Sequence, residues 1–362
     1  MSSFFGQNLK LSLFGQSHGE AIGITIDGFP AGMTLDMPYI LDEMARRAPG
    51  RSDLSSARRE ADQPEILSGV MNGRTTGQPI ACIIRNTGAR AADYGDGVDL
   101  VRPGHADYTG HVRYFGMEDW RGGGHFSGRL TAPIVFAGAL CSQWLRGQGV
   151  SIVSHVQQLG AIHDASLLNT PVPDPDALHA MTLPVLIAGL NAQMEAEILR
   201  AKEAGDSVGG VVECMISGLP AGLGAPFFDS VESVLSHLLF SVPAVKGVSF
   251  GEGFGFAGLR GSEANDAFRM QDSRIVTETN RCGGILGGIT NGMPVIFRAC
   301  IRPTPSIAKS QQTVSLKTGE NAELTIRGRH DPCIIPRALP VIEAMAAIGV
   351  MELMKERAAF SQ

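Results

Sequence analysis

A histidine near the N-terminus lies in a segment suited to proton transfer. Ser17 and His18 stand between glycines in Phe14–Gly19, directly before an alternating apolar segment. Imidazole gains or loses a proton near neutral pH, and small neighbours leave it open to a ligand. By itself, however, this short sequence fits a histidine hydrogen-bonded within a turn better than an acid–base group.

A larger group of polar side chains lies in two glycine-rich segments, Val101–Asp107 and Arg121–Arg129. Its members are Arg102, His105, His125, Ser127 and Arg129. Glycine-rich loops before a helix bind anions through free N–H groups and the helix dipole. Arginine adds a planar fork of donors that matches phosphate and carboxylate oxygens. The pattern predicts an anion-binding site; the alternative is an arginine- and glycine-rich surface loop.

Asp331 belongs to a third segment, Gly328–Cys333, directly before an apolar C-terminal region. Between Arg, His and Pro, its carboxylate either makes a structural Asx-type bond or ion pair, or accepts a proton. The residues by themselves favour the structural interpretation over the proton acceptor.

One glycine pattern, Gly253–Gly258, matches G-x-G-x-x-G after the strand-like Val248–Phe250. A dinucleotide site would need a helix to begin there and an acidic residue about 20 positions further on. Because the sequence continues as a loop, we interpret it as a glycine-rich turn.

The elements that must position these residues are short and mixed. Alternating apolar residues indicate strands at Ile22–Ile26 and Val208–Ile216. Periodicity and caps predict helices at Met37–Arg47 after Asp36, Ala132–Arg146, Ala192–Ala204, Ser230–Phe240 after Asp229, and Pro340–Glu356. Since there is no regular βαβ rhythm, we expect an α+β fold in one domain over residues 1–362. Four long segments show no element of their own: Gly50–Pro64, Gly88–Gly110, Gly261–Cys282 and Pro303–Gly319.

Composition narrows the class of function. The 362 residues carry a net charge of −6 and only 6% aromatic side chains, which disfavours a nucleic-acid partner, since single-strand binders need a basic groove and stacking rings. No apolar run approaches the roughly 20 residues that span a bilayer, and the N-terminal segment does not resemble a signal peptide. We therefore expect a cytoplasmic protein. Six singly scattered cysteines predict reduced thiols, with neither disulfides nor a metal site.

Taken together, these segments resemble the chorismate synthase family. Three are similar to its signatures: Gly15–Gly19 running to Asp27–Pro30, Ser127–Arg129 with Val135 and Gly138, and Arg329–Cys333 running to Glu343. Further similar blocks are Arg102–Asp107, Leu67–Gly69 with Thr75–Gly77, Gly218–Gly224, Val245–Val248 and Gly283–Gly288. They follow the family's order, so the resemblance covers essentially the whole chain.

The resemblance implies a fold and a reaction. The fold is a sandwich of antiparallel sheets enclosed by helices, assembled as a homotetramer. The reaction is the elimination of phosphate from 5-enolpyruvylshikimate 3-phosphate to give chorismate, the last common step of the shikimate pathway to the aromatic amino acids. It is catalysed by a carbon–oxygen lyase that uses reduced FMN without net oxidation. NADPH enters only indirectly, as a source of reducing equivalents, and we expect this chain not to reduce its own flavin.

The resemblance also implies the site residues. His18 protonates the departing phosphate, His105 stabilises the reduced flavin by protonation, and Asp331 assists proton removal at the flavin. The substrate carries a phosphate and two carboxylates, and its binding residues are Ser17, Arg47, Arg102, Ser127, Arg129 and Arg329. The flavin contacts are His125, Phe126, Ser127, Pro243, Ala244, Gly287, Arg302, Pro303, Thr304, Pro305, Ser306 and Arg329.

The chain departs from the family pattern at several positions. Asp53 stands where the family often has a substrate-binding Arg; we expect Arg51 to supply that guanidinium, because two residues of extended chain span at most about 7 Å. His125 and Phe126 replace Arg-Ser, Pro243 replaces Asn, and Arg302 replaces Lys. None of these changes affects His18, His105 or Asp331. The alternative function is a paralogue that binds flavin or phosphosugar acids without turnover.

Overall fold

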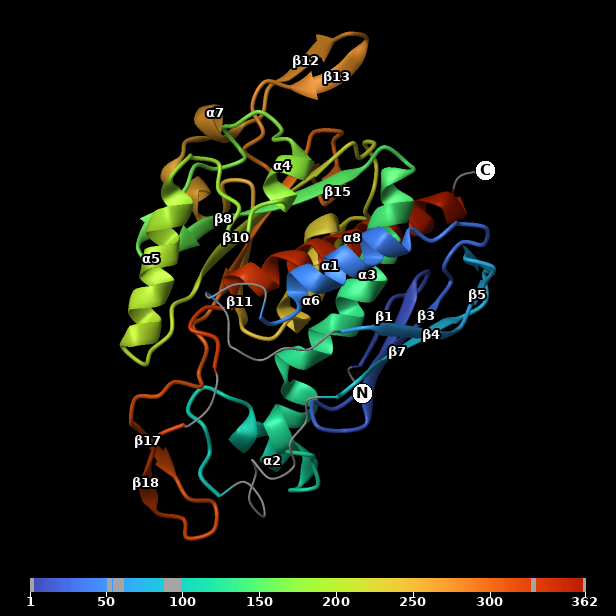
Figure 1. Cartoon of the computed structure of the whole chain (residues 1–362). Helices are drawn as coiled ribbons and strands as arrows, with labels where there is room; N and C mark the ends of the chain where they lie inside the picture. Colours follow the sequence, from blue (N-terminus) through green and yellow to red (C-terminus); the bar gives the residue numbers. More distant parts are fainter. Residues whose placement is uncertain (1–2, 51–53, 55–61, 88–98, 327–329, 361–362) are drawn as a thin grey trace.

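Two antiparallel sheets lie on either side of a central layer of helices (Figure 1). The computed structural model describes residues 3–50, 54, 62–87, 99–326 and 330–360. The first sheet has the order β1 (Phe4–Phe5), β2 (Lys10–Gly15), β3 (Ala21–Asp27), β7 (Ile80–Arg85) and β4 (Pro64–Ser68). The second has the order β11 (Val245–Phe250), β16 (Val295–Ile301), β10 (Gly210–Ser217), β8 (Ser151–Leu159) and β9 (Ile162–His163).

Helices α3 (Thr131–Arg146) and α8 (Ile335–Phe360) form the centre of the molecule. They pack along each other, with α3 against β3 and β7 of the first sheet and α8 against β8 and β10 of the second. The crossing is close enough that a Cβ on Gly138 would lie 2.2 Å from the Cβ of Ala344. One hydrophobic core therefore joins both sheets.

Further helices cover this core. Helix α1 (Met37–Arg47) packs on α3 and α8, α6 (Val231–Ser241) on α8 and β11, and α4 (Pro175–His179) and α5 (Leu190–Glu203) on β8 and β9. The smaller helices are α2 (Asp107–Tyr114) and α7 (Gly261–Ala264), with 3₁₀ turns η2 (Arg121–Phe126), η3 (Gly128–Leu130), η4 (Phe227–Asp229) and η5 (Gly253–Gly258). Short pairs are β5 (Val70–Met71) with β6 (Arg74–Thr75), β12 (Phe268–Gln271) with β13 (Arg274–Thr277), β14 (Ile285–Leu286) with β15 (Ile289–Thr290), and β17 (Gln311–Val314) with β18 (Asn321–Leu324).

The α+β class and the paired antiparallel sheets are confirmed. Helix α1 has the predicted bounds and its cap, since the Tyr39 N–H donates to Asp36 Oδ1 at 3.1 Å. Gly253–Gly258 is a 3₁₀ turn that leads into extended chain at Leu259, as the glycine-rich-turn interpretation requires.

Several helix starts differ from the prediction. Helix α5 begins at Leu190, two residues before the predicted Ala192. The cap of α6 is Ser230, whose Oγ accepts from the Ser233 N–H, because Asp229 is already part of η4. Helix α8 begins at Ile335, five residues before the predicted start at Pro340. Proline inside a helix removes a backbone hydrogen bond. Here Ile335 and Leu339 are buried in the core, which accounts for the helix extending through the proline.

Three segments expected to lack elements contain them. Gly261–Cys282 holds α7 and the β12–β13 hairpin, Pro303–Gly319 holds β17, and α2 begins inside Gly88–Gly110. The hairpin was missed because its turn residues are Asp272 and Ser273, both at positive φ (46° and 62°), a conformation usually marked by glycine. Of Gly50–Pro64, most residues lie outside the described part.

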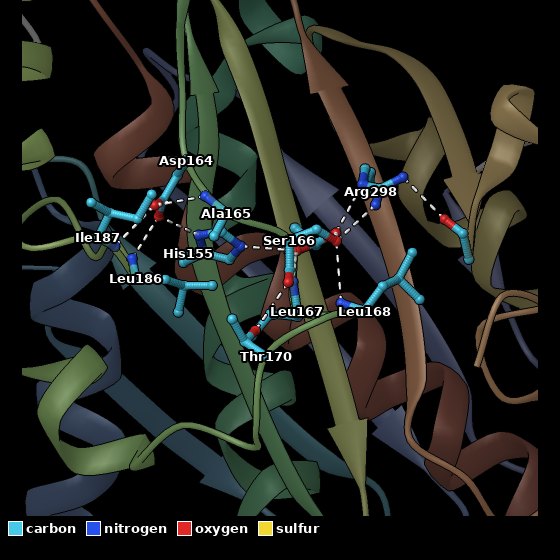
Figure 2. A network of polar contacts seen from close by, with 12 residues as sticks. His155, Asp164, Ala165, Ser166, Leu167, Leu168, Thr170, Leu186, Ile187 and Arg298 are labelled. Atoms are coloured by element: carbon cyan, nitrogen blue, oxygen red, sulfur yellow. Dashed lines mark hydrogen bonds and ion pairs between the residues drawn. The ribbon is translucent and has the colours of Figure 1, made fainter. Parts of the chain in front are cut away.

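A buried polar network crosses the second sheet (Figure 2). His155 on β8 is fully buried, and its Nδ1 and Nε2 donate to Asp164 and Glu213, each at 3.0 Å. Glu213 on β10 also accepts from Arg298 Nε on β16 at 2.8 Å. Asp164 accepts the backbone N–H groups of Leu186 and Ile187. Through these bonds the network connects the loops that follow β9 and α4 to strands β8, β10 and β16.

Candidate active site

A cavity of about 850 Å³ lies between the first sheet and helices α3, α6 and α8. Its volume is within the range of small-molecule sites, roughly 300–1,000 Å³. Apolar side chains of β2, β3, α3 and α8 form part of the wall: Leu11, Leu13, Ile24, Ile134, Val341, Met345 and Ile348. Basic side chains also line it: Arg47, Arg129, Lys246, Arg302 and Arg337. The cavity thus combines a surface for a ring system with cations for anionic groups.

Most of the residues expected in the site line this cavity. They are Arg47, His105, His125, Phe126, Ser127, Arg129, Pro243, Ala244, Arg302, Thr304, Pro305, Ser306 and Asp331. Ser17, His18, Arg102, Gly287 and Pro303 are not lining residues. Gly287 lies in the turn between β14 and β15. Arg51, Asp53 and Arg329 lie outside the described residues.

Two neighbouring glycines bring His18 and His105 to the same turn, η2. A Cβ on Gly122 would lie 2.2 Å from the His18 ring, and a Cβ on Gly123 would lie 3.0 Å from the His105 ring. Both glycines have positive φ, 60° and 84°, a conformation that glycine adopts without steric cost. The Ser17 N–H donates to the Gly124 carbonyl at 3.0 Å. The two histidines therefore contact consecutive residues although 87 positions separate them in the sequence.

His105 is oriented by a carboxylate on the first turn of α2. Its Nδ1 donates to Asp107 Oδ1 at 2.8 Å, and Arg102 binds the same carboxylate through Nη2 at 2.6 Å and Nε at 2.7 Å. Burial alone would raise the pKa of Asp107, but hydrogen bonds from Arg102 and His105 outweigh it and hold that pKa well below its usual range. An ionised Asp107 fixes the imidazole by its Nδ1 and leaves Nε2 for a ligand.

Asp331 stands at the N-terminal end of α8, where Arg337 pairs with it. Arg337 Nε also donates to the Arg47 carbonyl at 3.0 Å, so the ion pair is tied to the end of α1. Next to it, burial and then the charge of Arg102 lower the pKa of His330. A neutral His330 and a paired Asp331 therefore face the cavity side by side.

Some expected ligand-binding residues also have partners within the protein. His125 Nδ1 lies 2.8 Å from the Gly15 carbonyl and its Nε2 lies 3.0 Å from Ser3 Oγ, which links η2 to β2. Ser127 caps η3 by accepting from the Arg129 N–H at 3.3 Å. Arg302 Nη1 donates to the Gly104 carbonyl at 2.7 Å, which places the segment after β16 beside the His105 loop.

Sequence reasoning missed Asp62, Asp107 and Arg337. Asp107 ends the second segment, Val101–Asp107, and its spacing of two from His105 is a usable signal. Arg337 lies six residues after Asp331, on the first turns of a helix whose start was placed too late. Asp62 comes near the end of a segment with no expected element, and nothing in its neighbours signals that it binds two distant arginines.

An α+β fold, two histidines that contact one glycine turn and arginines at a partly apolar cavity are together typical of an enzyme with a small-molecule substrate. Comparisons with known proteins identify the enzyme family. The chain belongs to the chorismate synthase family, whose model matches residues 9–354.

Relatives named chorismate synthase align over nearly the whole chain. The protein of Dehalococcoides mccartyi is 45% identical (98% of this chain, 96% of the relative). The Thermococcus kodakarensis protein is 43% identical (98% of each), and the Methanosarcina barkeri protein 46% (97% and 95%). A crystal structure of a chorismate synthase superposes with a TM-score of 0.76 at 27% identity, covering 98% of this chain and 93% of that one.

Proposed function

We propose that this protein is a phosphate-eliminating lyase that converts 5-enolpyruvylshikimate 3-phosphate to chorismate with reduced FMN. The observation that carries the proposal is that His18 and His105 contact the consecutive residues Gly122 and Gly123, and that His105 lines the cavity together with arginines. Family membership over residues 9–354 supports the same reaction.

The residues of the cavity fit a flavin. An isoalloxazine ring system needs an extended apolar wall, which β2, β3 and α8 supply, and a phosphate needs cations, which Lys246 and Arg302 supply. Pro243, Ala244 and the 304–306 segment line the same space. When bound, reduced flavin supplies the electron density and the proton acceptor that no side chain here offers for a weakly acidic C–H.

The chain's own residues would bind anions and move protons. Arg47, Arg129 and Arg102, with Ser17 and Ser127, would hold the phosphate and carboxylates of the substrate. His18 would donate a proton to the leaving phosphate. His105, fixed through Nδ1 by Asp107, would present Nε2 as a proton donor to the flavin, and Asp331 would assist in accepting the substrate proton. Ser17, Arg102 and Arg329 belong to the proposal on family grounds, since Ser17 and Arg102 do not line the cavity and Arg329 lies outside the described residues. Arg51 belongs to it as a substitute for the arginine that the family often has at the position of Asp53.

The test is an anaerobic assay with the phosphorylated substrate and chemically reduced FMN. We expect chorismate and phosphate to form in equal amounts without stoichiometric flavin oxidation. His18→Ala should lower turnover by roughly 10²–10⁴-fold, as expected for a general acid, with little change in substrate affinity. NADPH with oxidised FMN should not support the reaction. A folded, flavin-loaded sample that forms no chorismate would contradict the proposal, and the paralogue that binds without turnover would replace it.

A further inference from the structure

Asp62 joins two arginines that come from different elements. Arg47 Nη1, at the end of α1, donates to Asp62 Oδ2 at 2.7 Å, and Arg129 Nη1, on η3, donates to Asp62 Oδ1. All three side chains are buried, and the carboxylate of Asp62 is fully inaccessible to solvent. Burial alone would raise the pKa of Asp62, but the charges of Arg47 and Arg129 lower it. The carboxylate is therefore ionised and shared.

The position of Asp62 relative to the cavity indicates what this sharing does. Arg47 and Arg129 line the cavity, whereas Asp62 does not. The carboxylate thus binds the two guanidinium groups from the protein side. The backbone of Asp62 has φ of 44°, an uncommon conformation for a residue with a side chain. Such a conformation persists only where the surrounding structure holds it.

The remaining donors of both arginines confirm that their orientation is fixed. Arg47 Nε donates to Thr131 Oγ1 at 3.1 Å and its Nη2 donates to the Gly128 carbonyl at 2.8 Å. Arg129 Nε donates to Asn86 Oδ1 at 3.1 Å. Two buried guanidinium groups repel each other strongly without a counter-charge. With Asp62 between them, the trio keeps a net charge of +1.

We propose that Asp62 is a positioning residue for anion binding, which holds Arg47 and Arg129 charged and aligned to take one anionic group of the substrate between them. The inference rests on the proposed function, since it assigns the anion to the substrate. The pKa of Arg47 adds support: burial lowers it most, the charges of Arg337 and Arg129 also lower it, Asp62 opposes them, and the pKa that results is about 10. Arg337 is itself paired with Asp331.

The experiment measures binding of inorganic phosphate to the flavin-free protein by calorimetry between pH 7 and pH 10. Asp62→Asn should weaken phosphate binding roughly ten- to hundredfold at pH 7, because a charge-assisted contact is lost from each arginine. As pH rises, the phosphate affinity of this variant should also begin to fall at a lower pH than that of the wild type, since Arg47 loses the group that keeps it protonated. Asp62→Glu keeps the charge but displaces it. Its phosphate affinity should therefore fall, while the pH at which affinity begins to be lost (the alkaline limb of the curve of affinity against pH) should stay as in the wild type.

The matched control is Glu43→Gln. Glu43 is a buried carboxylate that pairs with Arg46, the residue next to Arg47, at 2.9 Å, and it does not line the cavity. Its removal should cost stability but leave phosphate affinity and the alkaline limb unchanged.

If folded Asp62→Asn binds phosphate with wild-type affinity and wild-type pH dependence, the proposal is overturned. Tighter phosphate binding would also overturn it, because Asp62 would then compete with the anion for the arginines. If Asp62→Asn does not fold, wild-type affinity in Asp62→Glu would overturn it. Because phosphate binding is measured without turnover, these results are independent of whether chorismate is formed.

Discussion

At the scale of single residues, the proposed acid–base groups depend on neighbours that have no reactive atoms. His18 and His105 contact Gly122 and Gly123. A Cβ at Gly122 would overlap the His18 imidazole, whereas a Cβ at Gly123 would make a tight contact of 3.0 Å with the His105 ring. Both glycines also have positive φ. Conformation therefore favours glycine at both positions, and space requires it at Gly122.

Gly122→Ala tests this dependence. The added Cβ would lie 2.2 Å from His18, so the ring must move and turnover should fall at least tenfold in the anaerobic assay. Gly73→Ala is the control, because Gly73 also has positive φ (73°) but has no atom within 4 Å of its Cβ position. Both variants should lose roughly 1–2 kcal/mol of stability from left-handed strain, and only Gly122→Ala should lose activity. Equal activity in the two variants would contradict the role of Gly122.

Part of the candidate site was predictable from the sequence because its members are close together in the chain. Arg102, His105 and Asp107 span six residues, and the glycines of Arg121–Arg129 indicate a turn, which the structure has at Arg121–Phe126. Asp62 binds arginines 15 and 67 positions away. No local pattern encodes such a contact, because it exists only after α1, α3 and the first sheet have packed together.

At the scale of elements, the second sheet carries a charge network whose stability depends on pH. Burial would lower the pKa of His155, but hydrogen bonds to Asp164 and Glu213 outweigh it and raise that pKa above 6.5. Burial would raise the pKa of Asp164 and Glu213, but hydrogen bonds from His155 and from backbone N–H groups outweigh it and lower both. The folded state therefore favours charged forms on both sides of each contact.

The sign of the pH effect follows from these shifts. The contribution of His155 is fully present below pH 6.5 and is lost as pH rises through its higher folded pKa. The contributions of Asp164 and Glu213 are present above their ordinary values, 3.8 and 4.5, and are lost as pH falls through their lowered folded pKa values. The network thus stabilises most between about pH 4.5 and 6.5.

The pH dependence of the His155 contribution can be checked by urea unfolding of the wild type and of His155→Gln between pH 5.5 and 9. The difference in unfolding free energy should be largest near pH 6 and should shrink as pH rises. His163→Gln, at an exposed position on β9, should not change the pH dependence. A difference that stays constant over the whole range would show that His155 acts by packing and not by charge.

Elements with strong caps and periodicity were predictable, and weakly marked ones were not. Helix α1 has an aspartate cap, an amphipathic pattern and a terminating proline and glycine, so its bounds agree with the structure. Hairpin β12–β13 has a turn without glycine, and the start of α8 is obscured by a proline within the helix. For α8, tertiary contacts and not local propensity decide where the helix begins, since Ile335 and Leu339 are buried in the core.

At the scale of the whole molecule, the arrangement of sheets around α3 and α8 agrees with the expected α+β class. Within the described residues, no helix is long and apolar enough to cross a membrane. The single domain, the location in the cytoplasm and the assembly into a homotetramer stay predictions. The prediction of a homotetramer can be tested at one exposed part of the surface.

Hairpin β12–β13 projects from the body of the molecule (Figure 1) and exposes apolar side chains. Phe268, Met270 and Ile275 are each about two-thirds exposed. Met270 and Ile275 are directly paired, and Phe268 is two residues from Met270, so all three share one face. An isolated two-stranded hairpin is marginally stable in water, and an exposed apolar patch marks an interaction site. We therefore expect this face to be covered by another copy of the chain.

Sedimentation velocity tests this expectation on the flavin-free protein. The wild type should sediment with four times the mass of one chain, and the double variant Met270→Glu with Ile275→Glu should sediment as a smaller species, because buried unpaired carboxylates oppose association. Val172→Glu is the control. Val172 is an exposed apolar residue outside the hairpin, in the loop before α4, so this variant should keep the wild-type mass. A monomeric wild type would refute self-association. An intact tetramer in the double variant would place the interface elsewhere on the molecule, because two carboxylates on the hairpin face are incompatible with its burial in an apolar contact.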